Sequence, residues 1–292
     1  MIYTLLLISA ASSALSNSLI KLYRRRIDDQ NVKDSLYYTL MIAVALVFFS
    51  ILSGFDLRVN LVTLLFASVY ALVAYVSVTI NMRAIEKAEL LTLSIFSNAG
   101  SVMWSTIWGT VLFKEPLDFG RGIGIASVLA AIILPFLFER RRGAAGFRGL
   151  GYCLLMFLIS GCGQLVVKLY SLSDSVMENS VFCFYTNVVL IPFVFLILKR
   201  KNSVKAVFKN MLRVDLKTVL MLASGLLLAN FCTIIEMLVI GKVDLVVYTI
   251  LGKSLNITVM AVAASIFFKE KFTTEKLASI LLLILAVVAV TV

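Results

Sequence analysis

Residues 243–272 read VDLVVYTILGKSLNITVMAVAASIFFKEKF, an apolar run long enough to cross a bilayer as a helix, with Lys253 inside it. A related run, AELLTLSIFSNAGSVMWSTIWGTVLFKEPL, occupies residues 88–117, where Asn98 stands at the position of the lysine. Each run contains Phe-Lys-Glu near its end. Because the two runs correspond at a constant offset of 155 residues, we interpret them as equivalent helices of two related halves.

The rest of the chain is also built from apolar runs. Its 292 residues are 61% hydrophobic, with a mean hydropathy of +1.02, more apolar than an ordinary globular domain. Long apolar runs separated by short polar breaks are typical of helical membrane proteins, whereas β-barrel strands alternate polar and apolar residues. The sequence therefore predicts an all-α integral membrane protein with ten transmembrane helices, near residues 2–22, 35–53, 60–82, 88–113, 120–138, 149–170, 178–198, 216–240, 243–268 and 274–291.

The internal repeat predicts the organisation of the chain. From residue 60 onward the offset of 155 pairs Met82 with Met237, and nearer the start an offset of 147 pairs Asn17 with Gln164. Two repeats of five spans each insert in opposite orientations, as in many secondary transporters with inverted repeats. We predict a first five-helix repeat at residues 1–138, a basic linker at 139–148 and a second five-helix repeat at 149–292.

The net charge of +11 comes from basic residues concentrated in alternate breaks between the runs. The positive-inside tendency then predicts that these breaks are cytoplasmic and that both termini lie outside, in what we expect to be a bacterial plasma membrane. Such residues contact lipid headgroups, so the expected partner is membrane lipid and not nucleic acid. The chain has no histidine, and its four cysteines lie within apolar runs. We therefore expect no cofactor and no metal site.

Lys253 is the first candidate site residue, because a charge near the bilayer centre costs about 2.5–3.5 kcal/mol and normally faces a cavity or a partner. One hypothesis is that it anchors a carboxylate or phosphate of a substrate. The alternatives are a structural ion pair with Glu236, or a lysine that burial keeps neutral. The first two readings are compatible if a substrate competes for the lysine. Glu236 itself is a candidate for proton coupling or, equally, for capping the turn that follows its helix.

Amides at repeat-related positions extend this candidate site. Asn81 corresponds to Glu236 and Asn98 to Lys253, so one half has two neutral amides where the other has an acid and a base. A single buried amide commonly makes only a helix–helix hydrogen bond of about 0.6 kcal/mol. Several symmetric polar pairs favour a shared polar cavity, for which we also propose Asn17, Gln164 and, with weaker support, Asn230 and Asn256.

Aromatic side chains give weaker candidates. Trp104 and Trp108 lie one helical turn apart and could form one wall of a cavity, although packing or lipid contact is the favoured explanation. Tyr38 and its counterpart Tyr185 have the same two interpretations. The acids at residues 115 and 270 are expected to cap turns or to interact with neighbouring bases, with a gating role as the alternative.

The repeat, the ten predicted spans and the Phe-Lys-Glu endings resemble the drug/metabolite transporter superfamily, in its ten-helix EamA-type branch. The likeness extends over nearly the whole chain. It implies a pseudosymmetric helical carrier with a central cavity that moves small polar or amphipathic metabolites by alternating access. Many ten-helix relatives have cytoplasmic termini, and the charge distribution here predicts the opposite orientation.

We therefore expect a secondary-active transporter whose partner is a small-molecule substrate, anionic or zwitterionic, such as an amino acid. The alternatives are a flippase or flippase subunit for a lipid-linked sugar, and a phosphosugar or nucleotide-sugar exchanger. An enzyme is disfavoured because the sequence offers neither a nucleophile with a base nor a set of metal ligands. A monomer and a homodimer both remain open.

Overall fold

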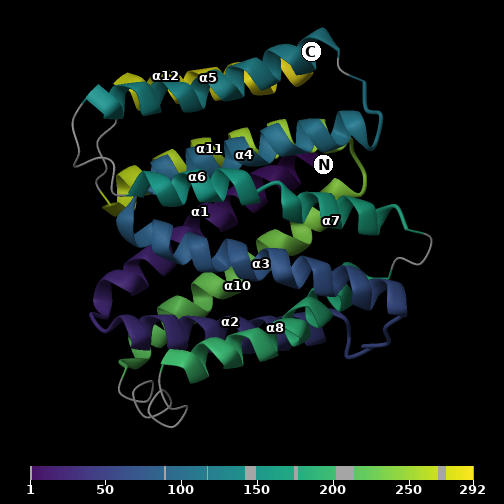
Figure 1. The fold of residues 1–292 in the computed structure, drawn as a ribbon, viewed down its shortest axis with the longest axis vertical. Coiled ribbons are helices and arrows are strands. Elements are labelled where there is room, and N and C mark those ends of the chain that lie inside the picture. Colours follow the sequence, from purple (N-terminus) through teal and green to yellow (C-terminus); the bar gives the residue numbers. More distant parts are fainter. Residues whose placement is uncertain are drawn as a thin grey trace.

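The computed structural model describes residues 2–88, 90–116, 118–141, 149–173, 177–201, 214–268 and 274–291. Within these ranges the chain is helical and contains no strand (Figure 1). The helices are α1 (Ile2–Arg26), α2 (Gln30–Leu52), α3 (Leu61–Lys87), α4 (Leu90–Val111), α5 (Phe119–Arg141), α6 (Leu150–Ile159), α7 (Cys162–Ser171), α8 (Asn179–Lys201), α10 (Leu216–Ile240), α11 (Leu245–Phe268) and α12 (Thr274–Thr291).

Polar residues at the breaks start the apolar helices. The carboxylate of Asp29 accepts hydrogen bonds from the first amides of α2, and the side chain of Asn60 accepts one from the amide of Thr63 at 2.7 Å. These contacts satisfy backbone donors that the first turn of a helix leaves unpaired. Helix positions agree with the predicted apolar runs to within a few residues at most ends, because apolar length and capping residues determine both.

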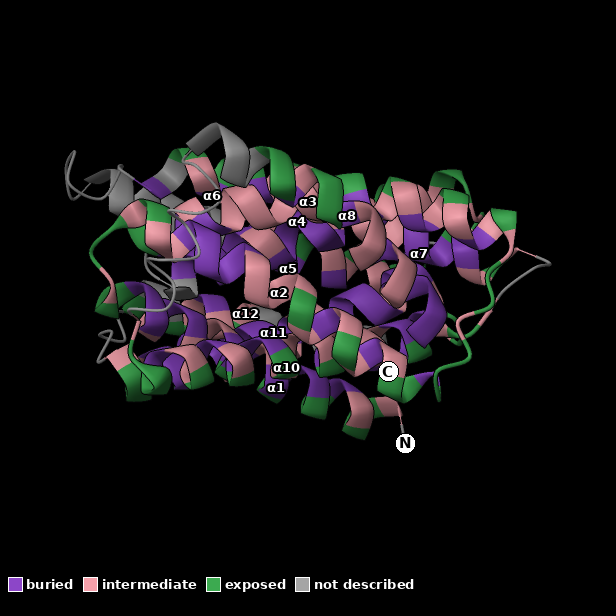
Figure 2. Ribbon diagram, turned by 90° about the horizontal axis from the view of Figure 1, so that it is seen from below, coloured by how far each residue is buried: buried purple, intermediate pink, exposed green. Residues whose placement is uncertain are grey.

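Within the described residues, seven helical segments are long and apolar enough to cross a membrane, which supports an all-α membrane protein. They are Ile2–Arg26, Gln30–Leu52, Leu61–Lys87, Gly151–Ser171, Asn179–Leu196, Leu216–Ile240 and Leu245–Phe268. Large apolar side chains are exposed along the outer faces of these helices, as Leu65 and Leu220 are. Figure 2 shows buried residues along the interior of the bundle and exposed residues on its outward faces and at its ends.

The sixth predicted span, residues 149–170, is interrupted by a turn at Ser160 and Gly161, so that it forms α6 and α7. A Cβ atom on Gly161 would lie 2.2 Å from the Cβ atom of Trp104 on α4, so only glycine allows this approach. The hydroxyl of Ser101 donates to the carbonyl oxygen of Ser160 at 3.2 Å. That bond satisfies a backbone acceptor at the interruption, which a membrane environment requires.

The helices run roughly parallel or antiparallel to one another (Figure 1), with α5 packed on α12 at one edge and α2 on α8 at the opposite edge. Between them α1 packs on α10, and α4 on α11. Gly120 brings α5 against α12, since a Cβ atom there would lie 2.3 Å from the carbonyl oxygen of Ala289. Further contacts join α1 with α11, α4 with α6, α3 with α8, α2 with α10, α3 with α6 and α7, α4 with α5, and α11 with α12.

Both ends of the chain lie toward the same end of the bundle, in the views of Figures 1 and 2. We call this the terminal end. The opposite end, where α1 finishes and α2 begins, contains Arg24, Asp34 and Glu86, and we call it the Arg24 end.

Candidate functional site

Lys253 of α11 and Glu236 of α10 form an ion pair inside the bundle. The Nζ atom of Lys253 donates to Oε1 of Glu236 at 3.2 Å, and their side chains are 12% and 33% exposed. The ammonium also lies 5.9 Å from the ring centroid of Tyr248, five residues earlier on α11. The ion pair considered as an alternative from sequence is therefore present, and it explains how a lysine is accommodated deep in an apolar helix.

Two cavities, each of about 310 Å³, adjoin this pair. The first chamber is lined from α1, α2, α3, α4, α6, α10 and α11, and the second from α3, α4, α6, α7, α10 and α11. Both are lined by the same five residues at their boundary: Ser97, Asn98, Met156, Glu236 and Lys253. The ion pair therefore faces both chambers.

The chambers extend toward opposite ends of the bundle. Along α1 the lining of the first chamber runs from Ser13 to Ile20, toward Arg24. Along α6 and α7 the lining of the second chamber runs from Ser160 to Val167, toward the terminal end. The two chambers therefore lie on opposite sides of the ion pair.

Four amides predicted from the sequence line the first chamber: Asn17, Asn81, Asn98 and Asn256. The Nδ2 atom of Asn98 donates to Oδ1 of Asn256 at 3.1 Å and to the hydroxyl of Ser94 at 2.9 Å. These bonds join α4 to α11 beside the ion pair. They also hold the Asn98 amide in a fixed orientation, so the wall of the chamber is preorganised.

Gln164 lines the second chamber from α7. Its Oε1 atom accepts a hydrogen bond from the hydroxyl of Ser105 at 2.8 Å. Of the predicted polar residues, Asn17, Asn81 and Asn256 therefore belong to the first chamber, Gln164 to the second, and Asn98 and the ion pair to both.

The predicted aromatic residues lie away from these two chambers. Tyr38 packs between α2 and α3, where its hydroxyl is 3.2 Å from that of Thr79. The hydroxyl of Tyr185 donates to the carbonyl oxygen of Leu57 at 2.8 Å, in the connection between α2 and α3. Trp104 stacks on Trp108, with ring centroids 5.7 Å apart, and its Cβ atom packs against the turn that separates α6 from α7.

Glu115, which follows the fourth predicted span, caps a different helix. Its carboxylate accepts hydrogen bonds from the backbone amides of Leu245 at 2.7 Å and Val246 at 3.0 Å, the first residues of α11. A carboxylate at a helix N-terminus satisfies unpaired donors and complements the helix dipole. Glu115 thereby fixes the start of the helix that carries Lys253. Its counterpart Glu270 lies outside the described residues.

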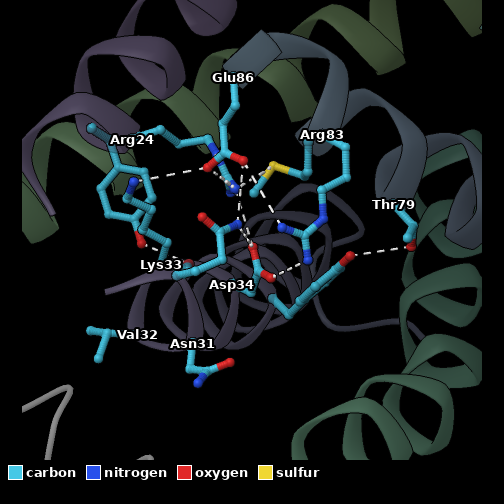
Figure 3. Close-up of polar contacts among 12 residues, drawn as sticks. Arg24, Asn31, Val32, Lys33, Asp34, Thr79, Arg83 and Glu86 are labelled. Carbon is cyan, nitrogen blue, oxygen red and sulfur yellow. Dashed lines mark hydrogen bonds and ion pairs between the residues drawn. The ribbon is translucent and has the colours of Figure 1, made fainter. Parts of the chain in front are cut away.

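Sequence reasoning missed a network of charged residues at the Arg24 end (Figure 3). Arg24 contacts Asp34 at 3.2 Å and donates through Nε to Glu86 at 3.0 Å, and Arg83 contacts Asp34 at 3.0 Å. The side chains of Arg24 and Asp34 are only 2% and 5% exposed. The network joins α1, α2 and α3. The sequence feature that could have indicated this network is the presence of opposite charges at the adjoining ends of these three helices.

Lys168 was a second residue with no assigned role. Its Nζ atom donates to the carbonyl oxygens of Val243 at 2.8 Å and Ile240 at 3.2 Å. A lysine at this point satisfies acceptors at the end of α10. It therefore fixes the short connection between the two helices that carry Glu236 and Lys253.

The arrangement can bind an anion but offers little to a metal. Lys253 provides a positive charge in a partly enclosed, polar-lined space, with amide and hydroxyl groups around it for orientation. Within the described residues no group of three or more His, Cys, Asp or Glu side chains is placed to hold a metal ion.

No protein-family model matches this chain, and no curated protein matches it. Its fold does match solved structures. One of these, described only as the crystal structure of a protein, shares 14% sequence identity with this chain and superposes with a TM-score of 0.60, covering 97% of this chain and 95% of the other. At this identity the similarity concerns the fold alone, and it extends over almost the whole length of both chains.

Proposed function

We propose that the protein is a secondary-active transporter that binds a small anionic or zwitterionic metabolite at Lys253 and moves it by alternating access. The observation that carries this proposal is that the Lys253–Glu236 pair faces two chambers, which extend toward opposite ends of the bundle. A transporter needs one binding group that is reachable in turn from each side. A buried ion pair that served only stability would not require a polar cavity on either side.

The proposal includes ten spans in two inverted repeats, and the chamber linings support it. The first chamber is lined from α1 by Ser13, Ser16, Asn17 and Ile20. Adding the offset of 147 gives the residues that line the second chamber from α6 and α7: Ser160, Gly163, Gln164 and Val167. Each half would then contribute an equivalent helix to an equivalent chamber. The charged departures from this symmetry are Lys253 in place of Asn98 and Glu236 in place of Asn81.

The helix contacts support the same proposal. If α1 corresponds to α6 and α7, α2 to α8, α3 to α10, α4 to α11 and α5 to α12, the contact of α1 with α10 corresponds to that of α6 and α7 with α3. Likewise the contact of α1 with α11 corresponds to that of α6 with α4, and the contact of α2 with α10 to that of α8 with α3. The edge pairs α2–α8 and α5–α12 correspond to themselves, as a two-fold axis requires.

Binding would proceed by exchange of ionic partners. In the absence of substrate, Glu236 neutralises Lys253. A substrate carboxylate or phosphate would take the place of that carboxylate on the ammonium, which keeps the charge paired throughout. The displaced Glu236, 33% exposed, could pair with the ammonium of a zwitterion or take up a proton. An amino acid or another zwitterion would satisfy both charged residues at once.

The orientation belongs to the same proposal. The Arg24 end contains basic residues at the end of α1 and near the end of α3, and the positive-inside tendency makes it cytoplasmic, with both termini outside. The first chamber would then face the cytoplasm. Together with the resemblance in spans and repeats, this favours a carrier of the drug/metabolite transporter type in a bacterial plasma membrane.

A ligand screen tests this function directly. The purified protein in detergent would be melted in the presence of amino acids, carboxylates, phosphosugars, nucleotide sugars and organic cations, because ligands that bind the folded state raise its melting temperature. We expect stabilisation by an anionic or zwitterionic class in the wild type and its loss in Lys253→Ala. Stabilisation by cations alone, or an undiminished response in Lys253→Ala, would contradict the proposal.

A further inference from the structure

A third cavity lies beside the two polar chambers, between α2, α3, α8 and α10. It has a volume of about 220 Å³, and we call it the apolar chamber. Its wall consists mainly of aromatic and aliphatic side chains: Tyr37, Tyr38, Met41, Phe49, Tyr70, Tyr75, Val78, Leu190, Val194 and Leu226.

Three polar side chains in its wall bond within their own helices, and Asn230, a candidate from the sequence, also lines it. The Nδ2 atom of Asn187 donates to the carbonyl oxygen of Cys183 at 2.9 Å, and the hydroxyl of Thr186 donates to the carbonyl oxygen of Phe182 at 2.9 Å. Thr233 likewise bonds to the carbonyl oxygen of Ala229 at 3.0 Å. These bonds lie within single helices, so these three groups are satisfied before any ligand enters, and the rest of the wall is mainly aromatic and aliphatic. The space therefore favours an apolar occupant.

The apolar chamber adjoins both polar chambers. It shares Tyr37 and Ala229 with the first, and Tyr70, Ala74, Val78 and Thr233 with the second. Ala74 and Ala229 correspond at the offset of 155, as do Val78 and Thr233. The chamber therefore takes equivalent positions from both halves of the chain, and a group inside it lies beside the path between the polar chambers.

We propose that the apolar chamber receives the aryl or branched alkyl group of the substrate while the anionic group of the same molecule binds Lys253. This inference rests on the proposed function and narrows the substrate class to amphipathic carboxylates and related zwitterions. An apolar cavity of about 150 Å³ can hold benzene, so 220 Å³ accommodates a six-membered ring or a branched chain. Purely polar anions such as small phosphosugars would leave the chamber unused.

Three small probes separate the two ends of such a substrate. Acetate carries only the anionic group, 3-phenylpropionate adds a ring at a short distance, and 3-phenylpropylamine keeps the ring but reverses the charge. Binding of each to the full-length protein in detergent would be measured by calorimetry. We expect 3-phenylpropionate to bind roughly tenfold or more tightly than acetate, because burying a phenyl ring adds that much affinity. The amine should bind more weakly than the carboxylate.

Variants that fill the apolar chamber test where the ring binds. Leu190 and Met41 line only this chamber among the three described, so Leu190→Trp and Met41→Trp should each remove most of the preference for 3-phenylpropionate and leave acetate binding unchanged. Val69 on α3 is 50% exposed on the outer face, and Val69→Trp is the matched control. An unchanged acetate response shows that a variant is folded, and two variants guard against the failure of one.

The outcomes distinguish a failure of this inference from a failure of the proposed function on which it rests. If acetate binding requires Lys253 but the phenyl group adds no affinity, or if both filling variants keep the preference, the apolar chamber is not the ring site and the anion site stands. If neither carboxylate binds the wild type in a way that depends on Lys253, both proposals are wrong. If dodecanoate displaces acetate from the protein and 3-phenylpropionate does not, the chamber accepts a lipid chain. That result also overturns the inference.

Discussion

Asn17 on α1 and Gln164 on α7 line two different chambers, one on each side of the Lys253–Glu236 pair. They are 147 residues apart and occupy corresponding places in a repeated sequence pattern. When two equivalent helices are inserted in opposite orientations, their equivalent polar residues face opposite ends of the bundle.

Access to the chambers can be tested with single cysteines. Ser13 lines only the first chamber and its counterpart Ser160 only the second. In a background with the four native cysteines replaced, a membrane-impermeant thiol reagent should label Ser13→Cys from the cytoplasmic side and Ser160→Cys from the outside. Mass spectrometry of sealed vesicles of known orientation gives the readout. Labelling of both positions from one side only would contradict opposed chambers.

The network at the Arg24 end should contribute strongly to stability. Arg24→Ala leaves the buried carboxylate of Asp34 with fewer partners, and loss of one member of a buried ion pair costs about 3 kcal/mol or more. We expect a clear fall in the melting temperature of the purified protein. Arg58 forms a solvent-exposed ion pair with Asp56, and the side chain of Arg58 is 89% exposed. Arg58→Ala should therefore change the melting temperature little. Equal effects of the two variants would show that the network is not stabilising.

The Glu115 cap should matter for both stability and the site. Glu115→Ala removes the acceptor for the first amides of α11, and loss of such a cap costs about 1 kcal/mol. Glu115→Gln, which keeps an acceptor oxygen but loses the charge, should cost less. Thermal unfolding measures both, with Asp56→Ala as the control at an exposed acid. A Gln variant as unstable as the Ala variant would indicate that the charge, and not the hydrogen bonding, is what matters.

The hydrogen bond between Asn98 and Asn256 joins α4 to α11, which the proposed repeat would relate to each other. A double-mutant cycle with Asn98→Ala and Asn256→Ala should give a coupling free energy of about 0.6 kcal/mol, the usual value for such bonds in membrane helices. Unfolding equilibria in mixed micelles provide the measurement. Strictly additive effects would show that the two amides act independently, and the fixed wall of the first chamber would need another explanation.

The helix positions follow from features that are visible in the sequence. Apolar runs of spanning length end at residues such as Asp29 and Asn60, which cap the helices that come next. The ion pair of Lys253 with Glu236 was also predictable as one of two alternatives, because the short connection between their helices keeps the side chains close and a membrane charge requires a partner.

Other features depend on contacts between distant segments. At the turn between α6 and α7, Gly161 packs closely against Trp104 on α4, and neither residue alone indicates an interruption. Arg24 belongs to a run of three arginines that reads as an orienting charge, yet α3 folds back to bury it against Glu86. Tyr185 looked like a cavity residue, but its hydroxyl is bonded to the connection before α3. Periodicity cannot reveal which helix will pack on which.

The most direct test of the central claim is counterflow of the stabilising ligand in proteoliposomes, compared between the wild type, Lys253→Arg and Lys253→Ala. If Lys253 binds the anionic group of the substrate, the Ala variant should lose exchange while the Arg variant, which keeps the charge, retains part of it. Glu236→Gln should still bind the ligand, because it removes the competing carboxylate. Exchange at the wild-type rate in Lys253→Ala would contradict the account.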